Sequence, residues 1–143
     1  MLSATRERAV ARAVTIAQNV GTASVVEWAK LALRSPRARV LRAARVRHEA
    51  PGCPIAFEEV VLPLDRFPCL AANGGEVPDL TELAQRYALS LAKVAERISI
   101  IQAPRDVALH LGIAAGTDVM KLNRVAETVD GEPIEWRVTF RKL

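Results

Sequence analysis

Six arginines fall within fourteen residues of this 143-residue chain, at positions 34, 37, 39, 42, 45 and 47. A guanidinium group presents a planar fork of donors that matches a carboxylate or a phosphate, so such a cluster suits an anionic ligand or a nucleic acid. The alternative is a solvated strand face on which the arginine stems cover apolar surface. Composition leaves these possibilities open, because the net charge is only +4.

Side-chain alternation along an extended strand separates these arginines into two sets. In the segment 39–49, Arg45 and Arg47 share a face with Leu41 and Ala43, while Arg42 belongs to the opposite face. A guanidinium on an apolar face must be paired or must line a cavity, because an unpaired buried charge is strongly unfavourable. Arg45 and Arg47 are therefore the first candidates for a binding site.

A second segment repeats this pattern 79 residues later. Between residues 40 and 55, six of sixteen positions are identical at that offset: Val40/Val119, Arg45/Arg124, Val46/Val125, Gly52/Gly131, Pro54/Pro133 and Ile55/Ile134. Chance would give about one identity, so we interpret the repeat as an internal duplication of a strand, a glycine turn and a second strand. The duplication puts Arg124 on the same face as Arg45.

The strand that returns after each turn adds carboxylates and further arginines. Glu58 lies on the first returning strand, and the second has Glu135, Arg137 and Arg141 on one face, opposite an apolar face of Ile134, Trp136, Val138 and Phe140. These charges could surround one polar pocket in which glutamates bind the hydroxyls or amines of a ligand. They could equally pair with one another across the strands. The pattern does not choose between the two arrangements.

The strands belong to a predicted α+β domain that spans residues 1–143. Strands are predicted at 10–20, 39–49, 55–63, 91–102, 117–128 and 133–141, and helices at 25–33, 80–87 and 105–111. Ser24 and Asp79 are expected to cap the first two helices, Asp79 in a capping box with Glu82, and Gly112 to end the third. The repeated order of elements indicates a largely antiparallel sheet of about six strands with flanking helices.

Other chemistry is sparse. His48 and His110 match no metal-ligand spacing, and the chain has no nucleophile-elbow, Walker or dinucleotide-binding motif, so we expect no metal, no cofactor and no catalytic residues. Cys53 and Cys69 fit no metal or redox spacing, which favours a reduced, cytoplasmic setting. No apolar run approaches the roughly 18 residues that a membrane span requires, so no membrane association is expected.

Several short stretches occur in a fixed order: Arg45-Val46-Arg47, Pro54-Ile55-Ala56-Phe57-Glu58, Leu62-Pro63, Phe67-Pro68, LTELAQRYAL at 80–89, Leu111-Gly112-Ile113, Leu122-Asn123-Arg124 and Gly131-Glu132-Pro133-Ile134-Glu135. Their order and spacing resemble the effector-binding (UTRA) domain of GntR-type bacterial transcription regulators of the HutC subfamily, over nearly the whole chain. The resemblance implies a chorismate lyase-like fold, a small-molecule pocket and a homodimer. It also implies an N-terminal winged-helix domain that contacts DNA, which nothing in this chain resembles.

The resemblance further implies roles for four of the charged residues. In relatives that bind phosphorylated sugars, arginines like Arg45 and Arg47 hold the anionic group, and carboxylates like Glu58 and Glu135 hold the rest of the ligand.

Two departures from the family bear on the ligand. Where phosphate-binding relatives often have a serine, this chain has Pro78-Asp79, and Arg141 stands where some relatives have a tyrosine. The added carboxylate argues against phosphate and for a ligand with a cationic or hydroxyl end, such as an amino acid derivative.

The sequence therefore predicts an effector-sensing domain that binds a small anionic or zwitterionic metabolite and controls DNA binding through dimer geometry. The predicted site comprises Arg45, Arg47, Glu58, Asp79, Arg124, Glu135, Arg137 and Arg141. One alternative is a chorismate lyase-like enzyme acting on a small anionic substrate, although no acid–base constellation is evident. Another is direct nucleic-acid binding by residues 34–47, which the lack of stacking aromatics disfavours.

Overall fold

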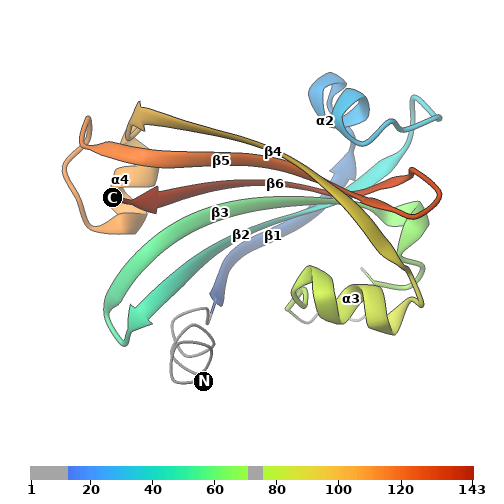
Figure 1. Cartoon of the computed structure of the whole chain (residues 1–143), viewed down its shortest axis with the longest axis horizontal. Helices are drawn as coiled ribbons and strands as arrows, with labels where there is room; N and C mark the ends of the chain where they lie inside the picture. The colour runs from blue at the N-terminus through green and yellow to red at the C-terminus, as the bar shows by residue number, and fades with distance from the viewer. Residues whose placement is uncertain (1–12, 71–75) are drawn as a thin grey trace.

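The computed structural model describes residues 13–70 and 76–143, which form six strands and short helices (Figure 1). The strands are β1 (Ala13–Thr22), β2 (Arg39–Ala50), β3 (Cys53–Pro63), β4 (Leu91–Gln102), β5 (Asp118–Thr128) and β6 (Pro133–Lys142). The helices are α2 (Val25–Lys30), α3 (Leu80–Arg86) and α4 (Arg105–Leu111), with a 3-10 turn, η1 (Leu64–Arg66). The predicted α+β class is confirmed.

The predicted boundaries agree with the structure to within two residues, apart from two places. Residues 10–12 of the first predicted strand lie outside the described residues. The helix predicted at 25–33 ends at Lys30. Beyond it, Ala32 adopts a left-handed conformation with φ of 48°, and Leu31 and Leu33 are buried in the core.

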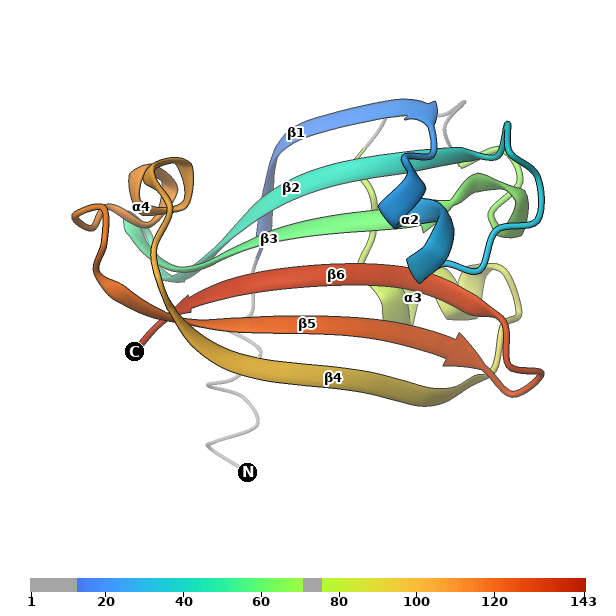
Figure 2. The same cartoon turned by 90° about the horizontal axis from the view of Figure 1, so that it is seen from above.

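All six strands form one antiparallel sheet in the order β1-β2-β3-β6-β5-β4, as Figure 2 shows. The order is symmetric about the β3–β6 contact, so each half contributes one edge strand and one hairpin. The hairpin turns contain Gly52 and Gly131, with φ of 77° and 80°, a region that side chains disfavour. Two equivalent glycines with the same conformation support the internal duplication.

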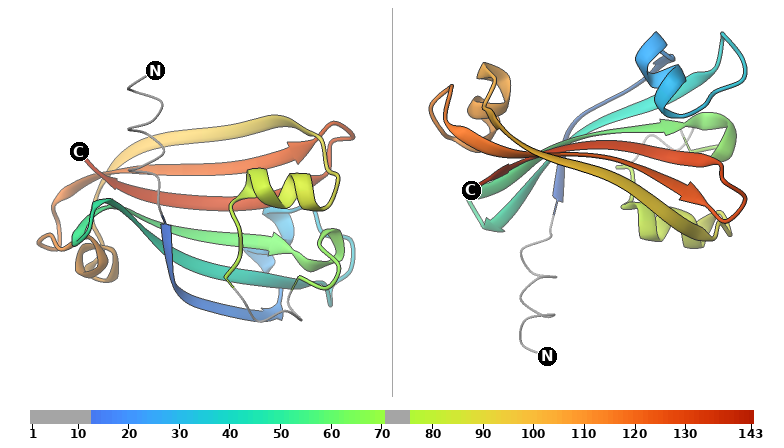
Figure 3. Two further views of the ribbon diagram at one scale, coloured as in Figure 1. Left: turned by 90° about the horizontal axis from the view of Figure 1, so that it is seen from below. Right: turned by 45° about the horizontal axis from the view of Figure 1, so that its top comes forward.

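The helices cover opposite faces of the sheet. Helix α3 packs on one face, and α2 and α4 pack near the two ends of the other (Figure 3). The α3-face core contains Leu41, Ala43, Val60 and Leu62, whereas Val40, Val46 and Phe57 belong to cores on the other face. The strand parity predicted for the first hairpin is confirmed by these core contacts.

One residue of the second hairpin departs from the prediction. Ile134 is fully buried in the α3-face core, whereas Trp136, Val138 and Phe140 pack on the other face. The β5–β6 pairing shifts register between Ala126 and Glu127, next to the start of β6. This irregularity interrupts the alternation on which the prediction depended.

Candidate effector-binding site

The sheet register gathers the predicted charged residues on the α3 face, beyond the end of its apolar core. Arg45 on β2 lies directly opposite Glu58 on β3, and Arg124 on β5 lies opposite Arg137 on β6. Arg141 lies opposite Ala56 on β3, two residues along from Glu58. Four adjacent strands therefore contribute to one cluster.

Glu58 is the centre of this cluster. It is 1% exposed, and Arg47 binds it in a bidentate manner, with Nε 3.1 Å from Oε2 and Nη2 3.0 Å from Oε1. Arg45 Nη1 lies 3.6 Å from Oε1, and Arg137 Nη1 lies 3.9 Å from Oε2. Three guanidinium groups thus surround one buried carboxylate, which gives Glu58 the pairing that a buried charge requires.

Asp79 joins the cluster from the start of α3. Its Oδ1 accepts hydrogen bonds from Arg45 Nη1 and Arg47 Nη2, both at 3.0 Å. The predicted capping role is wrong, because Asp79 occupies the N-cap position without any side-chain capping hydrogen bond. Two guanidinium groups attract its carboxylate more strongly than a neutral backbone N–H does.

Arg45 binds the segment that precedes α3. Its Nη2 donates to the carbonyl oxygens of Val77 at 2.9 Å and Pro78 at 3.1 Å. The residue is 2% exposed, so in this structure it holds the segment before α3 against the sheet.

Glu135 forms the second buried pair. It is 1% exposed, and its Oε1 accepts from Arg137 Nε at 3.0 Å and Nη2 at 2.9 Å. The glutamates therefore pair with arginines, which was one of the two arrangements left open by the sequence.

A cavity of about 570 Å³ lies beside these pairs. A pocket among the charged residues was the other arrangement left open by the sequence. Its charged lining is Arg47, Asp79, Arg124, Arg137 and Arg141, and the uncharged rest is Ile55, Ala56, Leu80, Thr81 and Leu91. This volume lies within the usual range for small-molecule sites. Five of the eight predicted residues line the cavity, while Arg45, Glu58 and Glu135 lie behind its wall.

Arg124 is a half-buried cation of the cavity lining without an ion pair among the described residues. Its Nε has no hydrogen-bond partner. Burial lowers the pKa of Arg124, and the positive charge of Arg137 lowers it further. A bound anion would relieve both effects, because it restores the balance lost on desolvation.

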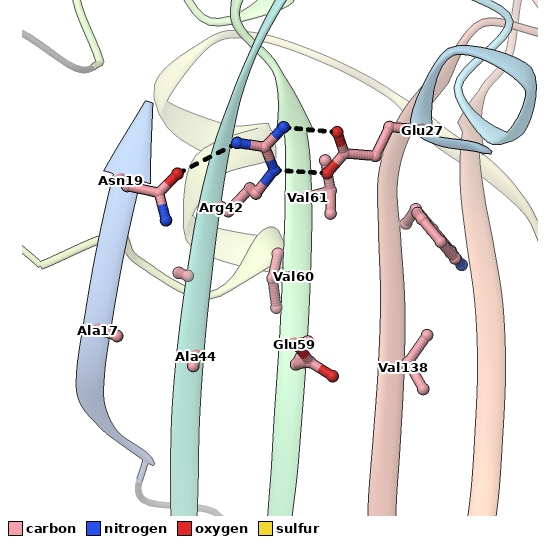
Figure 4. Close-up of a pocket in the computed structure, with 11 residues that line it drawn as sticks. Ala17, Asn19, Glu27, Arg42, Ala44, Glu59, Val60, Val61 and Val138 are labelled. Carbon is pink, nitrogen blue, oxygen red and sulfur yellow. Dashed lines mark hydrogen bonds and ion pairs between the residues drawn. The ribbon is translucent and has the colours of Figure 1, made fainter. Parts of the chain in front are cut away.

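The second large hollow lies on the opposite face, beside α2 (Figure 4). There Arg42 is engaged: Nε and Nη2 bind Glu27 at 2.7 and 2.8 Å, Nη1 donates to Asn19 Oδ1 at 3.2 Å, and Nη2 also donates to the Thr22 carbonyl at 3.0 Å. These bonds use four of the five N–H donors of the guanidinium, so at most one donor is left for a ligand. The α3-face cavity is therefore the better candidate.

Two further classes of site are absent from the part of the chain that the structure describes. No group of three or more His, Cys, Asp or Glu side chains is arranged to hold a metal ion there. No helix in these residues is long and apolar enough to cross a bilayer.

Comparison with known families gives the cavity its context. The family model of the UTRA domain matches residues 10–142. This chain belongs to the UTRA domain family. UTRA domains of GntR-type regulators have the chorismate lyase-like fold, which is the fold described above.

Several solved structures resemble this UTRA domain. A GntR-family transcriptional regulator from Enterococcus faecalis V583 has a TM-score of 0.77 and 25% identity, over 91% of this chain and 92% of that one. The effector domain of PhnF from Mycobacterium smegmatis has a TM-score of 0.81 and 25% identity, over 91% and 79%. The C-terminal domain of YurK from Bacillus subtilis subsp. subtilis str. 168 has a TM-score of 0.79 and 20% identity, over 90% and 87%. The chain is thus a regulatory ligand-binding domain.

The sequence did not predict the uncharged part of the cavity. Leu91 at the start of β4 and Thr81 in α3 line it. Neither residue carries a local signal, because their position depends on where α3 lies on the sheet. For Ala56 the sequence did carry a signal, because the alternation of β3 puts Ala56 on the same face as Glu58.

Proposed function

We propose that this UTRA domain senses a small anionic or zwitterionic effector in the α3-face cavity and thereby controls DNA binding by a GntR-type regulator of the HutC subfamily. The observation that carries the proposal is the unpaired, half-buried Arg124 beside Arg137 in a cavity of ligand size. Arg47, Arg124, Arg137 and Arg141 would contact the effector. Arg45, Glu58 and Glu135 would fix these arginines from behind.

The position of the cavity suggests how binding is transmitted. Its lining includes Asp79 and Leu80 of the α3 end and Arg124 and Arg137 of the second hairpin. An effector that contacts both parts favours the arrangement in which they are held together, and so shifts the population of α3 positions.

DNA contact would come from a separate N-terminal winged-helix domain, since the chain corresponds to 57% of the length of PhnF from Mycobacterium smegmatis. The exposed free thiols of Cys53 and Cys69 agree with a cytoplasmic location.

The alternatives have less support. Glu58 and Glu135 are each bound by arginine and do not line the cavity, so neither is placed to act on a substrate there. The basic cluster does not form one surface, because Arg42 and Arg45 pair on opposite faces of the sheet and Arg34 pairs with Glu132.

Replacing Arg124 by Met tests the site. We expect effector affinity to fall at least about tenfold, because one charge-assisted hydrogen bond is lost. The fold should persist, since the substitution removes an unpaired cation and keeps an apolar stem. The effector would first be identified by thermal-shift screening of sugar phosphates, amino acids and small carboxylates, and then titrated by calorimetry. The control is Arg37→Met, because Arg37 is exposed and outside the cavity. Equal affinity of the Arg124 variant and the unmodified protein would contradict the proposal.

We also propose that the domain forms a homodimer through edge strand β4. Val94, Ile98 and Ile100 are 48%, 58% and 57% exposed, and they alternate along one face of a strand whose outer edge is unpaired among the described strands. Exposed apolar rows of this kind are typical of protein interfaces.

Ile98→Asp should convert the dimer to a monomer in sedimentation equilibrium. Ser99→Asp, on the other face of β4, should remain dimeric. A monomeric unmodified protein, or an Ile98→Asp dimer, would contradict this interface.

A further inference from the structure

Asp79 has one carboxylate oxygen bound to the protein and one available to the cavity. Oδ1 accepts from Arg45 and Arg47, while Oδ2 accepts no hydrogen bond from the described residues. The side chain is 58% exposed and is part of the cavity lining. Asp79 is therefore a fixed anion at the mouth of the site, held by two guanidinium groups and still able to accept from a ligand.

The charges divide the cavity into two unlike walls. On the β2 and α3 side, Arg45 and Arg47 are matched by Glu58 and Asp79. On the β5 and β6 side stand the three guanidinium groups of Arg124, Arg137 and Arg141. Glu135 is the carboxylate that pairs with Arg137 on that side. Two guanidinium groups, those of Arg124 and Arg141, have no ion pair in the described residues.

We infer that Asp79 determines the specificity of the effector site: it selects a zwitterion whose anionic group binds Arg124 and Arg141 and whose ammonium group binds Asp79. This inference rests on the proposed function. An anionic group placed at Arg47 would meet the carboxylate of Asp79, and like charges at that separation repel. At Arg124 and Arg141 the anion finds unpaired cations instead. An ammonium group at Asp79 Oδ2 completes the match, because it donates to the free oxygen.

The same geometry predicts what Asp79 excludes. A ligand that carries only negative charge gains at Arg124 and Arg141 but leaves Asp79 without a donor and close to a second anion. Neutralising Asp79 frees part of the Arg47 guanidinium, which lines the cavity, for such a ligand. Asp79→Asn should therefore reverse the preference rather than only weaken binding.

The test uses two pairs of probes that differ only in an amine: L-glutamate with glutarate, and 2-aminoethyl phosphate with ethyl phosphate. For the unmodified protein, calorimetry should show that the amine-bearing member of at least one pair binds about tenfold or more tightly than its amine-free counterpart. In Asp79→Asn that ratio should fall to about one, with weaker binding of the amine-bearing probe and tighter binding of the amine-free probe. The control Glu82→Gln removes the same charge from the same helix at an exposed residue paired with Arg86, and it should keep the original ratio.

Three results would overturn the inference. They are equal or tighter binding of the amine-free probe in both pairs, a ratio that Asp79→Asn leaves unchanged, and no binding of either amine-bearing probe at about 10 mM. Arg124→Met separates this inference from the proposed function. If Arg124→Met abolishes binding of both members of a pair while Asp79→Asn keeps their ratio, the effector site stands and the role of Asp79 is wrong. If Arg124→Met has no effect on any probe, the site itself is wrong.

Discussion

Replacing Glu58 by Gln is expected to lower the free energy of unfolding by about 3–5 kcal/mol, the largest effect that we predict for a single polar residue. Glu58 is 1% exposed and has Arg47 in bidentate contact at 3.0 and 3.1 Å. Gln keeps the shape but loses the charge, and its NH2 group faces a guanidinium that also donates. The guanidinium of Arg45, 3% exposed at its side chain, then has Asp79 as its one carboxylate partner in the described residues.

Thermal and urea unfolding would measure this effect. At about 2–4 °C per kcal/mol for a domain of this size, the midpoint should fall by roughly 10 °C. The matched control is Glu59→Gln, the same substitution one residue further along β3 on the opposite face. Burial and the nearby Asp106 raise the pKa of Glu59, so loss of its charge should leave stability unchanged or slightly higher. Equal stability of the two variants would show that Glu58 does not hold the cluster together.

The sequence predicted the position of this cluster because strand geometry has a period of two. Once β2 and β3 pair as a hairpin around Gly52, the register puts Arg45 opposite Glu58. The 79-residue repeat then places Arg124 at the equivalent position in the other half. The fold and the choice of face follow from these local rules, with no knowledge of how the helices pack.

The depth of each residue did not follow from those rules. Arg45 and Glu58 are behind the cavity wall because α3 and the segment before it cover them, and that packing joins residues more than 30 positions apart. The role of Asp79 was mistaken for the same reason. A capping pattern is local, whereas the two guanidinium groups that compete for its carboxylate come from β2. Substitutions at Arg45 and Glu58 therefore test folding first, and those at Arg124 test binding.

The pair of Glu27 and Arg42 shows the same limit on the other face. Alternation assigned Arg42 to the face opposite Arg45, which is correct, but it named no partner. The partner lies in α2, and Glu27 also completes a capping box with Ser24, with distances of 2.8 and 3.1 Å. The carboxylate of Glu27 thus caps the start of α2 and also binds the helix to β2 through Arg42.

Glu27→Gln is accordingly expected to lower the free energy of unfolding by about 2 kcal/mol at neutral pH, since it weakens charged hydrogen bonds to Arg42. The hydrogen bonds from Arg42 hold the pKa of Glu27 below its ordinary value of 4.5. A carboxyl group with a lowered native pKa stabilises the fold fully above the unfolded value. This contribution declines as the pH falls below 4.5, because the unfolded state takes up the proton first, and it is lost once the native group is protonated.

The difference in unfolding free energy between the unmodified protein and Glu27→Gln should therefore be constant from neutral pH down to about 5, and should shrink as the pH falls below 4.5. Urea titrations at a series of pH values measure this difference directly, and other carboxylates that titrate in both proteins cancel. Glu82→Gln is the control, because its exposed pair with Arg86 contributes at most about 0.5 kcal/mol. A difference that stayed constant through pH 3 would mean that the charge of Glu27 is not what stabilises α2.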